Sequence, residues 1–312
     1  MRFPFQLAAG RRFDCAGFGE NALDHLITAP HYPEFDTKTE YVSHELLAGG
    51  QIASALVALQ RLGYATAYAG RFGADAEGEF GLSTLVAEGV NTDFSETVAG
   101  ARSQTAFIII DAASGERTIL WRRDSALRYH ADDAPLEIAA LARVLHLDAH
   151  DGAANIRLAR CARQHGTIVS ADIDNIDEHT HALLPLLDVL ITSREFPHKL
   201  TGLTDERHAL RETKSRYGCP LVGMTCGTRG ALLLIEDTFA ESPALPVPGG
   251  VRDTTGAGDA FHAGFIYGLL TGAEVESSLR YGAVVAALKC RQTGARAGLP
   301  TRTELEEYLQ RL

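Results

Sequence analysis

Short apolar runs and amphipathic stretches alternate along most of the chain. Compact apolar runs of strand length predict β-strands, and stretches with apolar residues at helical spacing that end near a glycine predict α-helices. In the first two thirds, the predicted strands are residues 13–19, 65–70, 143–148 and 167–173, and the predicted helices are residues 52–63, 76–88 and 152–166. Strands that alternate with helices indicate a mostly parallel sheet covered on both faces.

The same rhythm continues to the end of the chain. It predicts a helix end and a strand within 181–193, strands at 220–227 and 230–237, and helices at 205–218, 260–271, 276–290 and 302–312. No long linker, repeat or low-complexity tract interrupts it. We therefore expect residues 1–312 to form a single α/β domain.

Two segments depart from this rhythm. The β-rich runs 105–111 and 117–121 flank the turn sequence AASGE, which is typical of a hairpin. Residues 25–47 are polar, aromatic and poor in helix formers, so they predict one or two further strands. We expect the insertions at about 25–47 and 103–123 to pair as a small separate β-sheet, which could cover a site as a lid.

Charge and cysteine content narrow the function classes. The formal net charge of −11 argues against a nucleic-acid partner, because neutralising phosphates requires a surplus of Lys and Arg. The five cysteines have no metal-site or disulfide spacing. The N-terminal stretch does not resemble a secretory signal, and no apolar run approaches the ~20 residues that span a bilayer. We expect a cytoplasmic protein that has no membrane partner.

One motif carries candidate chemistry. In VRDTTGAGDAFHAGF, residues 251–265, the small residues Gly256, Ala257 and Gly258 precede Asp259 and an apolar helix. Free amide groups at a helix start favour anions, and Asp259 could take a proton from a hydroxyl that attacks a phosphate. A loop that only caps its helix would explain the small residues equally well.

The complete string DTTGAGDAFHAGF resembles the C-terminal signature of the ribokinase-like (PfkB) family of sugar kinases. GFGENALDHL resembles the first strand and loop of that family, and residues 47–92 resemble its N-terminal signature. The resemblance implies a ribokinase-like three-layer α/β/α fold with a mostly parallel central sheet and a β-sheet lid. It also implies an ATP-dependent sugar kinase that uses Mg²⁺.

The resemblance assigns roles on the acceptor side of the site. It implies that Asp259 is the general base and that the amides of residues 256–258 form an anion hole. The residues that it places around the sugar are Asp24, Asn21 as a weaker candidate, Gly49, Gly50, Gln51 and Ser54. Ser54 stands where the family commonly has asparagine, so its reach toward a hydroxyl is shorter.

On the nucleotide side, the loop TCGTRG resembles the family loop that approaches the phosphates. The residues implied are Thr225, Gly227, Gly230, Thr255 and Gly294. Taken alone, T-x-G-x-x-G is also explained by a hairpin turn. The resemblance implies that Glu195 binds Mg²⁺ through water, although Thr192 replaces the asparagine of the family motif. It also implies that Asp253 and Thr255 bind a monovalent cation such as K⁺.

The substrate is less clearly indicated. ASGERTILW and ALKCRQTGARAGLP resemble the ketohexokinase and sulfofructose-kinase branches, which implies that Arg117, Asp148 and His150 line the sugar pocket. Trp121 is a candidate for stacking on a sugar, whereas Arg123 is expected to lie on a solvated lid surface. We also expect His262 to serve helix packing.

Three other functions stay open at this point. They are a nucleoside kinase, a sugar-binding protein without catalysis, and a nicotinamide-dependent dehydrogenase. The last is disfavoured because GFGENA lacks the third glycine of G-x-G-x-x-G. We expect a homodimer through the lid sheet, because an exposed apolar sheet face favours association.

Overall fold

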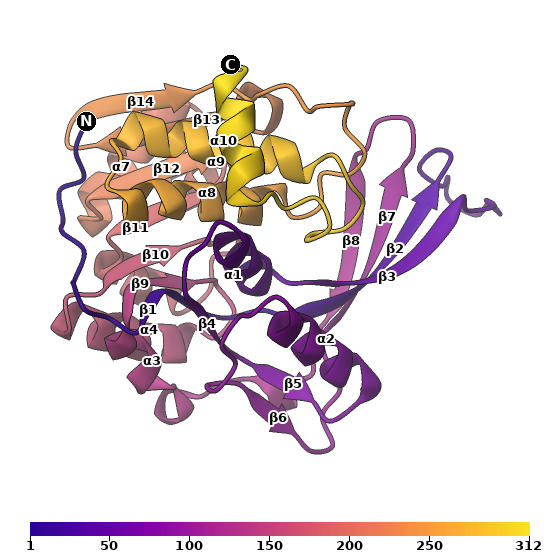
Figure 1. The fold of residues 1–312 in the computed structure, drawn as a ribbon, viewed down its shortest axis with the longest axis horizontal. Helices are drawn as coiled ribbons and strands as arrows, with labels where there is room; N and C mark the ends of the chain where they lie inside the picture. The colour runs from indigo at the N-terminus through magenta and orange to yellow at the C-terminus, as the bar shows by residue number, and fades with distance from the viewer.

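A computed structural model describes all 312 residues, and its centre is an eight-stranded sheet (Figure 1). In spatial order the strands are β14 (Thr238–Ser242), β13 (Ala231–Ile235), β12 (Leu221–Thr225), β11 (Val189–Ser193), β10 (Ile168–Ala171), β9 (Ala142–Leu147), β1 (Phe13–Phe18) and β4 (Thr66–Ala69). The sheet is parallel from β12 to β4, and only β13 and β14 pair antiparallel. The predicted mostly parallel sheet is confirmed.

Helices cover both faces of this sheet. One layer contains α1 (Gln51–Arg61), α8 (Ala257–Thr271), α9 (Val275–Lys289) and α10 (Arg302–Gln310). The other contains α3 (Leu136–Leu141), α4 (Gly152–Gln164), α5 (Thr180–Leu183), α6 (Glu195–Thr201) and α7 (Glu206–Tyr217). Successive side chains of a strand point to opposite faces of the sheet. Val144 packs in the core under the first helix layer, and Leu145 packs in the core under the second. This alternation explains why the strands are apolar throughout.

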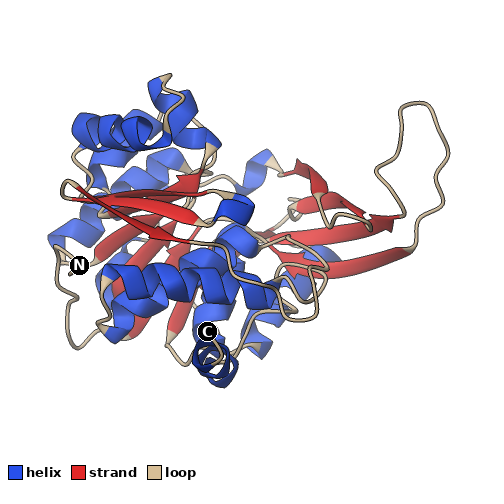
Figure 2. Ribbon diagram, turned by 90° about the horizontal axis from the view of Figure 1, so that it is seen from above, coloured by secondary structure: helices blue, strands red, loops and turns tan.

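A second sheet projects from the core, as Figures 1 and 2 show. Its strands, in spatial order, are β3 (Ser43–Gly49), β2 (Ala22–Ala29), β7 (Thr105–Asp111) and β8 (Arg117–Arg122). Only the β2–β7 pair is parallel. The two predicted insertions therefore do form one separate sheet, which we call the lid. Strand β2 begins at Ala22, three residues before the expected start at residue 25.

The connection between the two sheets determines where a site can form. Strands β1, β9, β10, β11 and β12 are parallel, so their carboxyl ends meet at one edge. The lid strand β2 begins four residues after the end of β1, so the lid rises from that same edge. Ligands of open α/β sheets bind at this edge.

Several short elements were not predicted from the pattern. They are β5 (Arg71–Gly73) and β6 (Glu96–Val98), which form a two-stranded sheet, together with β14, α3 and α6. Helix α2 (Ala76–Ala87), by contrast, begins after Asp75 as predicted, because the Asp75 carboxylate accepts a hydrogen bond from the Gly78 amide at 2.8 Å. None of the helices has the length and apolar character needed to span a bilayer.

Candidate active site

The start of α8 forms a small cradle of backbone amides. Gly256 adopts a left-handed φ of 75°, and a Cβ there would lie 2.8 Å from Ala295 Cα, so only glycine fits. The amides of Gly256, Gly258 and Asp259 have no hydrogen-bond acceptor. The amide of Ala257 donates to Thr254 O at 3.1 Å. The predicted anion hole therefore needs one correction: Asp259 supplies the third free amide, and Ala257 does not.

This cradle is open. Gly258 is exposed, and a Cβ built on it would meet no atom within 4 Å. Asp259 is partly exposed beside it, so the candidate base has access to a ligand. Burial raises the pKa of Asp259 to about 7; the neighbouring Asp172 raises it further, whereas His262 and Arg117 lower it. A carboxyl with this pKa can act as a base near neutral pH.

Beneath Asp259 lies a buried ion pair. His262 Nε2 is 3.4 Å from Asp172 Oδ1, and the His262 ring lies 5.1 Å from that of His146. Although burial opposes it, Asp172 raises the pKa of His262, while burial lowers the pKa of His146 to about 3. His262 is thus more than the packing residue expected from the sequence, because it lies one helical turn from Asp259 and lowers the pKa of that carboxyl.

On the sugar side, Asp24 lies at the base of the lid on β2 and is buried. Burial raises its pKa to about 7, and the positive charge of Arg296 opposes that rise. A Cβ on Gly49 would lie 1.9 Å from Asp24 Oδ2, so the predicted glycine is required for the carboxylate to fit. Gly50 has a left-handed φ of 90°, and a Cβ there would lie 2.5 Å from Asn21 Cα.

The neighbouring candidates differ in their freedom to bind a ligand. Gln51 Nε2 lies 3.4 Å from Asp172 Oδ2, while its Oε1 is buried without any partner. An unpaired buried acceptor is rare, which favours Gln51 as a ligand residue. Asn21, in contrast, donates through Nδ2 to Tyr68 Oη at 2.5 Å and to Arg71 O at 3.3 Å. Its amide nitrogen therefore holds the β1–β2 loop and is not available to a sugar.

Ser54 is completely buried, and its hydroxyl accepts a hydrogen bond from Arg296 Nε at 3.4 Å. The same guanidinium donates to Gly49 O and to Thr84 Oγ1. Burial lowers the pKa of Arg296 to about 10. Sequence analysis gave no role to Arg296; its only signal was its place in the string that resembles the family.

The ketohexokinase resemblance implies three residues at the sugar pocket, and the structure places these residues in different surroundings. Arg117 Nη1 donates to Thr254 Oγ1 at 2.7 Å, which brings the lid against the loop before the cradle. Asp148 is fully buried and accepts amide hydrogen bonds from Glu20 at 2.5 Å and His150 at 2.9 Å. Both oxygens of Asp148 therefore hold loop backbone, and its place in the sugar pocket stays a prediction.

His150 does face polar partners at the base of the lid. Its Nε2 is 3.0 Å from Glu20 Oε1, and this hydrogen bond raises the pKa of His150 to about 9 although burial opposes the shift. The ring of Trp121, which is 57% exposed, lies edge to face with it at 5.5 Å. Glu20 was missed from the sequence, where nothing distinguishes it from other loop carboxylates.

The predicted nucleotide loop follows β12 at the same edge. Cys226 N donates to Gly230 O at 2.7 Å, and Gly230, with φ of 94°, would place a Cβ 2.0 Å from Ser242 O. Gly227 has open space around it, and Thr225 Oγ1 contacts only Thr192 O, at 3.5 Å. A tight turn with an open glycine is compatible with close approach of a phosphate.

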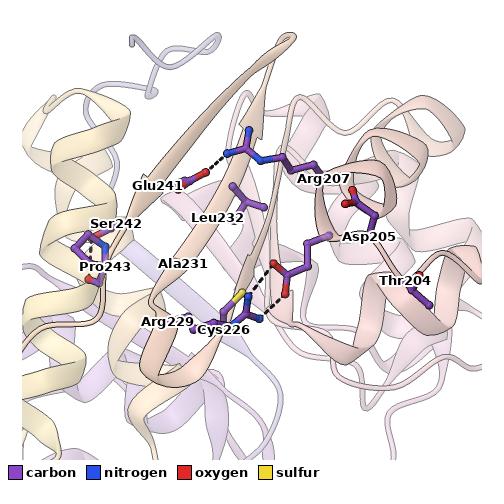
Figure 3. Close-up of a pocket in the computed structure, with 11 residues that line it drawn as sticks. Thr204, Asp205, Arg207, Cys226, Arg229, Ala231, Leu232, Glu241, Ser242 and Pro243 are labelled. Atoms are coloured by element: carbon purple, nitrogen blue, oxygen red, sulfur yellow. Dashed lines mark hydrogen bonds and ion pairs between the residues drawn. The ribbon is translucent and has the colours of Figure 1, made fainter.

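Beside this loop lies a cavity of about 510 Å³, between the β13–β14 hairpin and the start of α7 (Figure 3). Arg229 pairs there with Glu206, and Arg207 pairs with Glu241 (Figure 3). Because both arginines are paired and neither Asp24 nor Asp259 lines the cavity, we do not assign the phosphoryl-transfer site to it.

The remaining nucleotide and metal candidates already have hydrogen-bond or ion-pair partners within the protein. The Gly294 amide donates to Asp253 Oδ2 at 2.7 Å, and Thr255 donates to Asp253 Oδ1 through both N and Oγ1 at 2.8 Å. These groups hold the loop in the structure, and the nucleotide-binding role of Thr255 and Gly294 stays a prediction. Glu195 begins α6 and pairs with Arg194 at 3.2 Å.

Comparisons with known proteins identify the family of this chain. A family model described as pfkB family carbohydrate kinase matches residues 20–302. A nucleoside kinase from Methanothermobacter thermautotrophicus is 28% identical over 299 residues, which cover 93% of this chain and 94% of the relative. An uncharacterized sugar kinase from Archaeoglobus fulgidus is 32% identical over 257 residues, covering 78% and 98%.

Among solved structures, a ribokinase-type protein from Agrobacterium tumefaciens superposes with a TM-score of 0.88 at 28% identity, covering 96% of this chain and 98% of that one. The predicted fold is thereby confirmed, whereas nothing in these likenesses singles out the ketohexokinase branch. This chain is a phosphotransferase that belongs to the pfkB family of carbohydrate kinases.

Proposed function

We propose that the protein transfers the γ-phosphoryl group of Mg²⁺–ATP to a hydroxyl of a neutral monosaccharide, with Asp259 as the general base. The observation that carries the proposal is the start of α8, where three unpaired amides lie directly beside a partly exposed carboxyl. Preorganised donors of this kind stabilise charge that develops on a transferred phosphoryl group.

The chemistry follows from this arrangement. Asp259 takes the proton of the sugar hydroxyl, whose oxygen forms a bond to the γ-phosphorus while the bond to the β-phosphate oxygen breaks and ADP leaves. The amides of Gly256, Gly258 and Asp259 neutralise the migrating group, and Arg117 adds positive charge from the lid side. Closure of the lid over the substrate would exclude water and so prevent ATP hydrolysis.

The residues present fit a magnesium ion that arrives with the nucleotide. The protein has no cluster of three or more Asp, Glu, His or Cys that could hold a metal by itself. Mg²⁺ in kinases keeps several waters and takes only one or two carboxylates in addition to phosphates. Glu195 would hold it through water, since β11 and β12 place the Glu195 loop next to Thr225. The bound ion would neutralise phosphate charge.

The charges around the sugar site favour a neutral substrate. The carboxylates of Glu20, Asp24 and Asp259 surround the base of the lid, and the cations there already have partners: His150 pairs with Glu20, and Arg296 bonds to backbone and hydroxyl groups. Carboxylates accept hydrogen bonds from hydroxyls but repel an anionic group. A pentose or ketohexose therefore fits better than a sugar acid or sugar phosphate.

A nucleoside is the second candidate for the acceptor. Trp121 lies half exposed next to His150 on the ligand-facing side of the lid, where an aromatic ring could stack on a base. The nucleoside kinase relative from Methanothermobacter thermautotrophicus supports the same alternative. A sugar-binding protein without catalysis is disfavoured, because Asp259 and its free amides are present.

The decisive experiment measures ADP release from Mg²⁺–ATP with a panel of pentoses, ketohexoses and nucleosides. We expect one neutral sugar to give turnover, and we expect Asp259→Asn to lose about 10²–10⁴-fold in kcat while it still binds a non-hydrolysable ATP analogue, because only the base is removed. Isothermal titration checks binding. Near-wild-type turnover of Asp259→Asn would refute the role of Asp259.

Two further expectations belong with this proposal. We propose that two copies associate through the outward face of the lid, where Leu46, Phe107 and Leu120 are each 45% exposed or more. All five cysteines are free thiols, and the cytoplasmic location expected from the sequence stays a prediction.

A further inference from the structure

A buried lysine lies behind the amide cradle. Lys289 is the last residue of α9, and its side chain is completely inaccessible to solvent. Lysine is almost never fully buried unless it is paired. Its Nζ donates to the main-chain oxygen of Asp253 at 2.9 Å and lies 3.9 Å from Asp253 Oδ2. Both interactions therefore go to one residue of the loop that leads into the cradle.

This loop depends on Asp253 for its shape. The Asp253 carboxylate accepts hydrogen bonds from the Gly294 amide and from the amide and hydroxyl of Thr255. Arg252 N also donates to Cys290 O at 2.9 Å, which ties the loop to the end of α9. Through Thr255, the buried carboxylate fixes the chain immediately before Gly256, where the free amides begin.

A bound monovalent cation does not fit this loop together with Lys289. The predicted ligands were Asp253 and Thr255. The main-chain carbonyl oxygen of Asp253, which would bind the cation, already accepts a hydrogen bond from the Lys289 ammonium. A second positive charge at the same oxygen would be repelled at short range in a site that excludes water. An ammonium group carries the charge of K⁺ and has a similar size, and the carboxyl end of a helix favours a cation.

We propose that Lys289 is a built-in substitute for a bound monovalent cation: its ammonium holds the loop at residues 253–256, so that turnover does not depend on K⁺. The inference rests on the proposed function, because the loop carries the amides of the phosphoryl site. Lys289 is in this sense a positioning residue, since it touches Asp253 and not the substrates.

Wild-type turnover should change less than about twofold when K⁺ replaces tetramethylammonium at constant ionic strength, since the charge is already present. Lys289→Ala leaves a space and removes the positive charge beside Asp253. In tetramethylammonium we expect it to lose about tenfold or more in kcat, which corresponds to about 1.4 kcal/mol. Added K⁺ or NH₄⁺ should enter the space and restore turnover with saturating dependence on concentration.

Two matched variants separate this role from a general loss of stability. Lys289→Met fills the same space without a charge, so it should lose activity that K⁺ does not restore. Lys214 also bonds main-chain oxygens, those of Cys219 and Pro220, but at the opposite end of β12 from the site. Lys214→Ala should therefore lower Tm, yet its Tm and turnover should show no response that is specific for K⁺.

The melting temperature gives a readout that does not need activity. Tm of Lys289→Ala should rise in K⁺ relative to tetramethylammonium, whereas Tm of the wild type should not. The inference is overturned if K⁺ activates the wild type several-fold, if Lys289→Ala in tetramethylammonium keeps wild-type turnover, or if K⁺ changes neither Tm nor turnover of Lys289→Ala. Failure to find any turnover in the wild type would instead count against the proposed function.

Discussion

At the scale of single residues, the ionisation of Asp259 is set by opposing neighbours. Burial, Asp172 and Glu20 raise its pKa, while His262 and Arg117 lower it. Because the base must be ionised and its pKa lies at about 7, kcat should rise with pH through about 7. His262→Gln removes a positive charge, so the acidic limb should move to higher pH by roughly one unit.

We would test this prediction by measuring the pH dependence of kcat in His262→Gln and, as a control, in His146→Gln. His146 lies beside His262, but burial lowers its pKa to about 3 and keeps it neutral near pH 7. His146→Gln therefore removes no charge and should leave the acidic limb where it is. An unchanged profile in His262→Gln would show that the buried ion pair does not tune Asp259.

Gly258 gives a second prediction at this scale. Its φ is not left-handed and a Cβ would meet no protein atom, so Gly258→Ala should fold with an unchanged Tm. The added methyl group projects from the amide cradle, where we expect it to exclude a phosphoryl group and to lower kcat by about 10²-fold. Gly256→Ala is the contrast, since it should lower Tm as well. Wild-type kcat in Gly258→Ala would place the phosphoryl group elsewhere.

At the scale of elements, the lid is attached to the core by an ion pair as well as by the chain. Arg123, directly after β8, makes a bidentate contact with the Asp151 carboxylate before α4, at 2.7 and 3.1 Å. Their side chains are only 11% and 2% exposed. The expectation that Arg123 lies on a solvated lid surface was therefore wrong, because the end of β8 turns inward onto the α4 loop.

Arg123→Ala should lower the free energy of unfolding by about 3 kcal/mol, because it leaves the Asp151 carboxylate buried and unpaired. Urea denaturation followed by circular dichroism measures the effect. The neighbouring Arg122 is exposed on β8 and has no ion pair in the structure, so Arg122→Ala provides the control and should change stability little. Equal stability of both variants would contradict a structural role for the Arg123–Asp151 pair.

At the scale of the whole molecule, the outward face of the lid has no covering element. His25 stacks on Phe107 at 4.5 Å and on His44 at 5.5 Å, and Leu46 and Leu120 flank this stack. Exposed apolar surface of this kind favours association with a second copy. Because the opposite face of the same sheet carries Asp24, dimerisation would also stiffen the support of the sugar site.

Phe107→Glu should therefore convert the proposed dimer into a monomer, which sedimentation velocity would detect as a halving of the mass. Phe80 is similarly exposed, at 40% against 47%, but it lies on α2 outside the lid. Phe80→Glu should leave the mass unchanged. A wild-type protein that sediments as a monomer at micromolar concentration would refute the dimer.

The periodicity of the sequence determined most of the architecture. Long amphipathic helices such as α1, α4 and α7 were predictable because a buried face needs apolar residues at helical spacing, and the core strands because burial on both sides needs continuous apolar runs. Elements of three to seven residues, such as β5 and α6, contain too few positions for any period to emerge.

The sequence by itself also indicated the candidate base, Asp259, and the glycines around it, because a left-handed turn and a close backbone approach leave a local signature. Only the tertiary structure decided which charges meet. The charged neighbours of Asp172, Asp24 and Asp253 are His262, Arg296 and Lys289, and each comes from a segment more than 30 positions away. Chain folding creates such pairs, and no local pattern encodes them, because side chains interact through space and not along the chain.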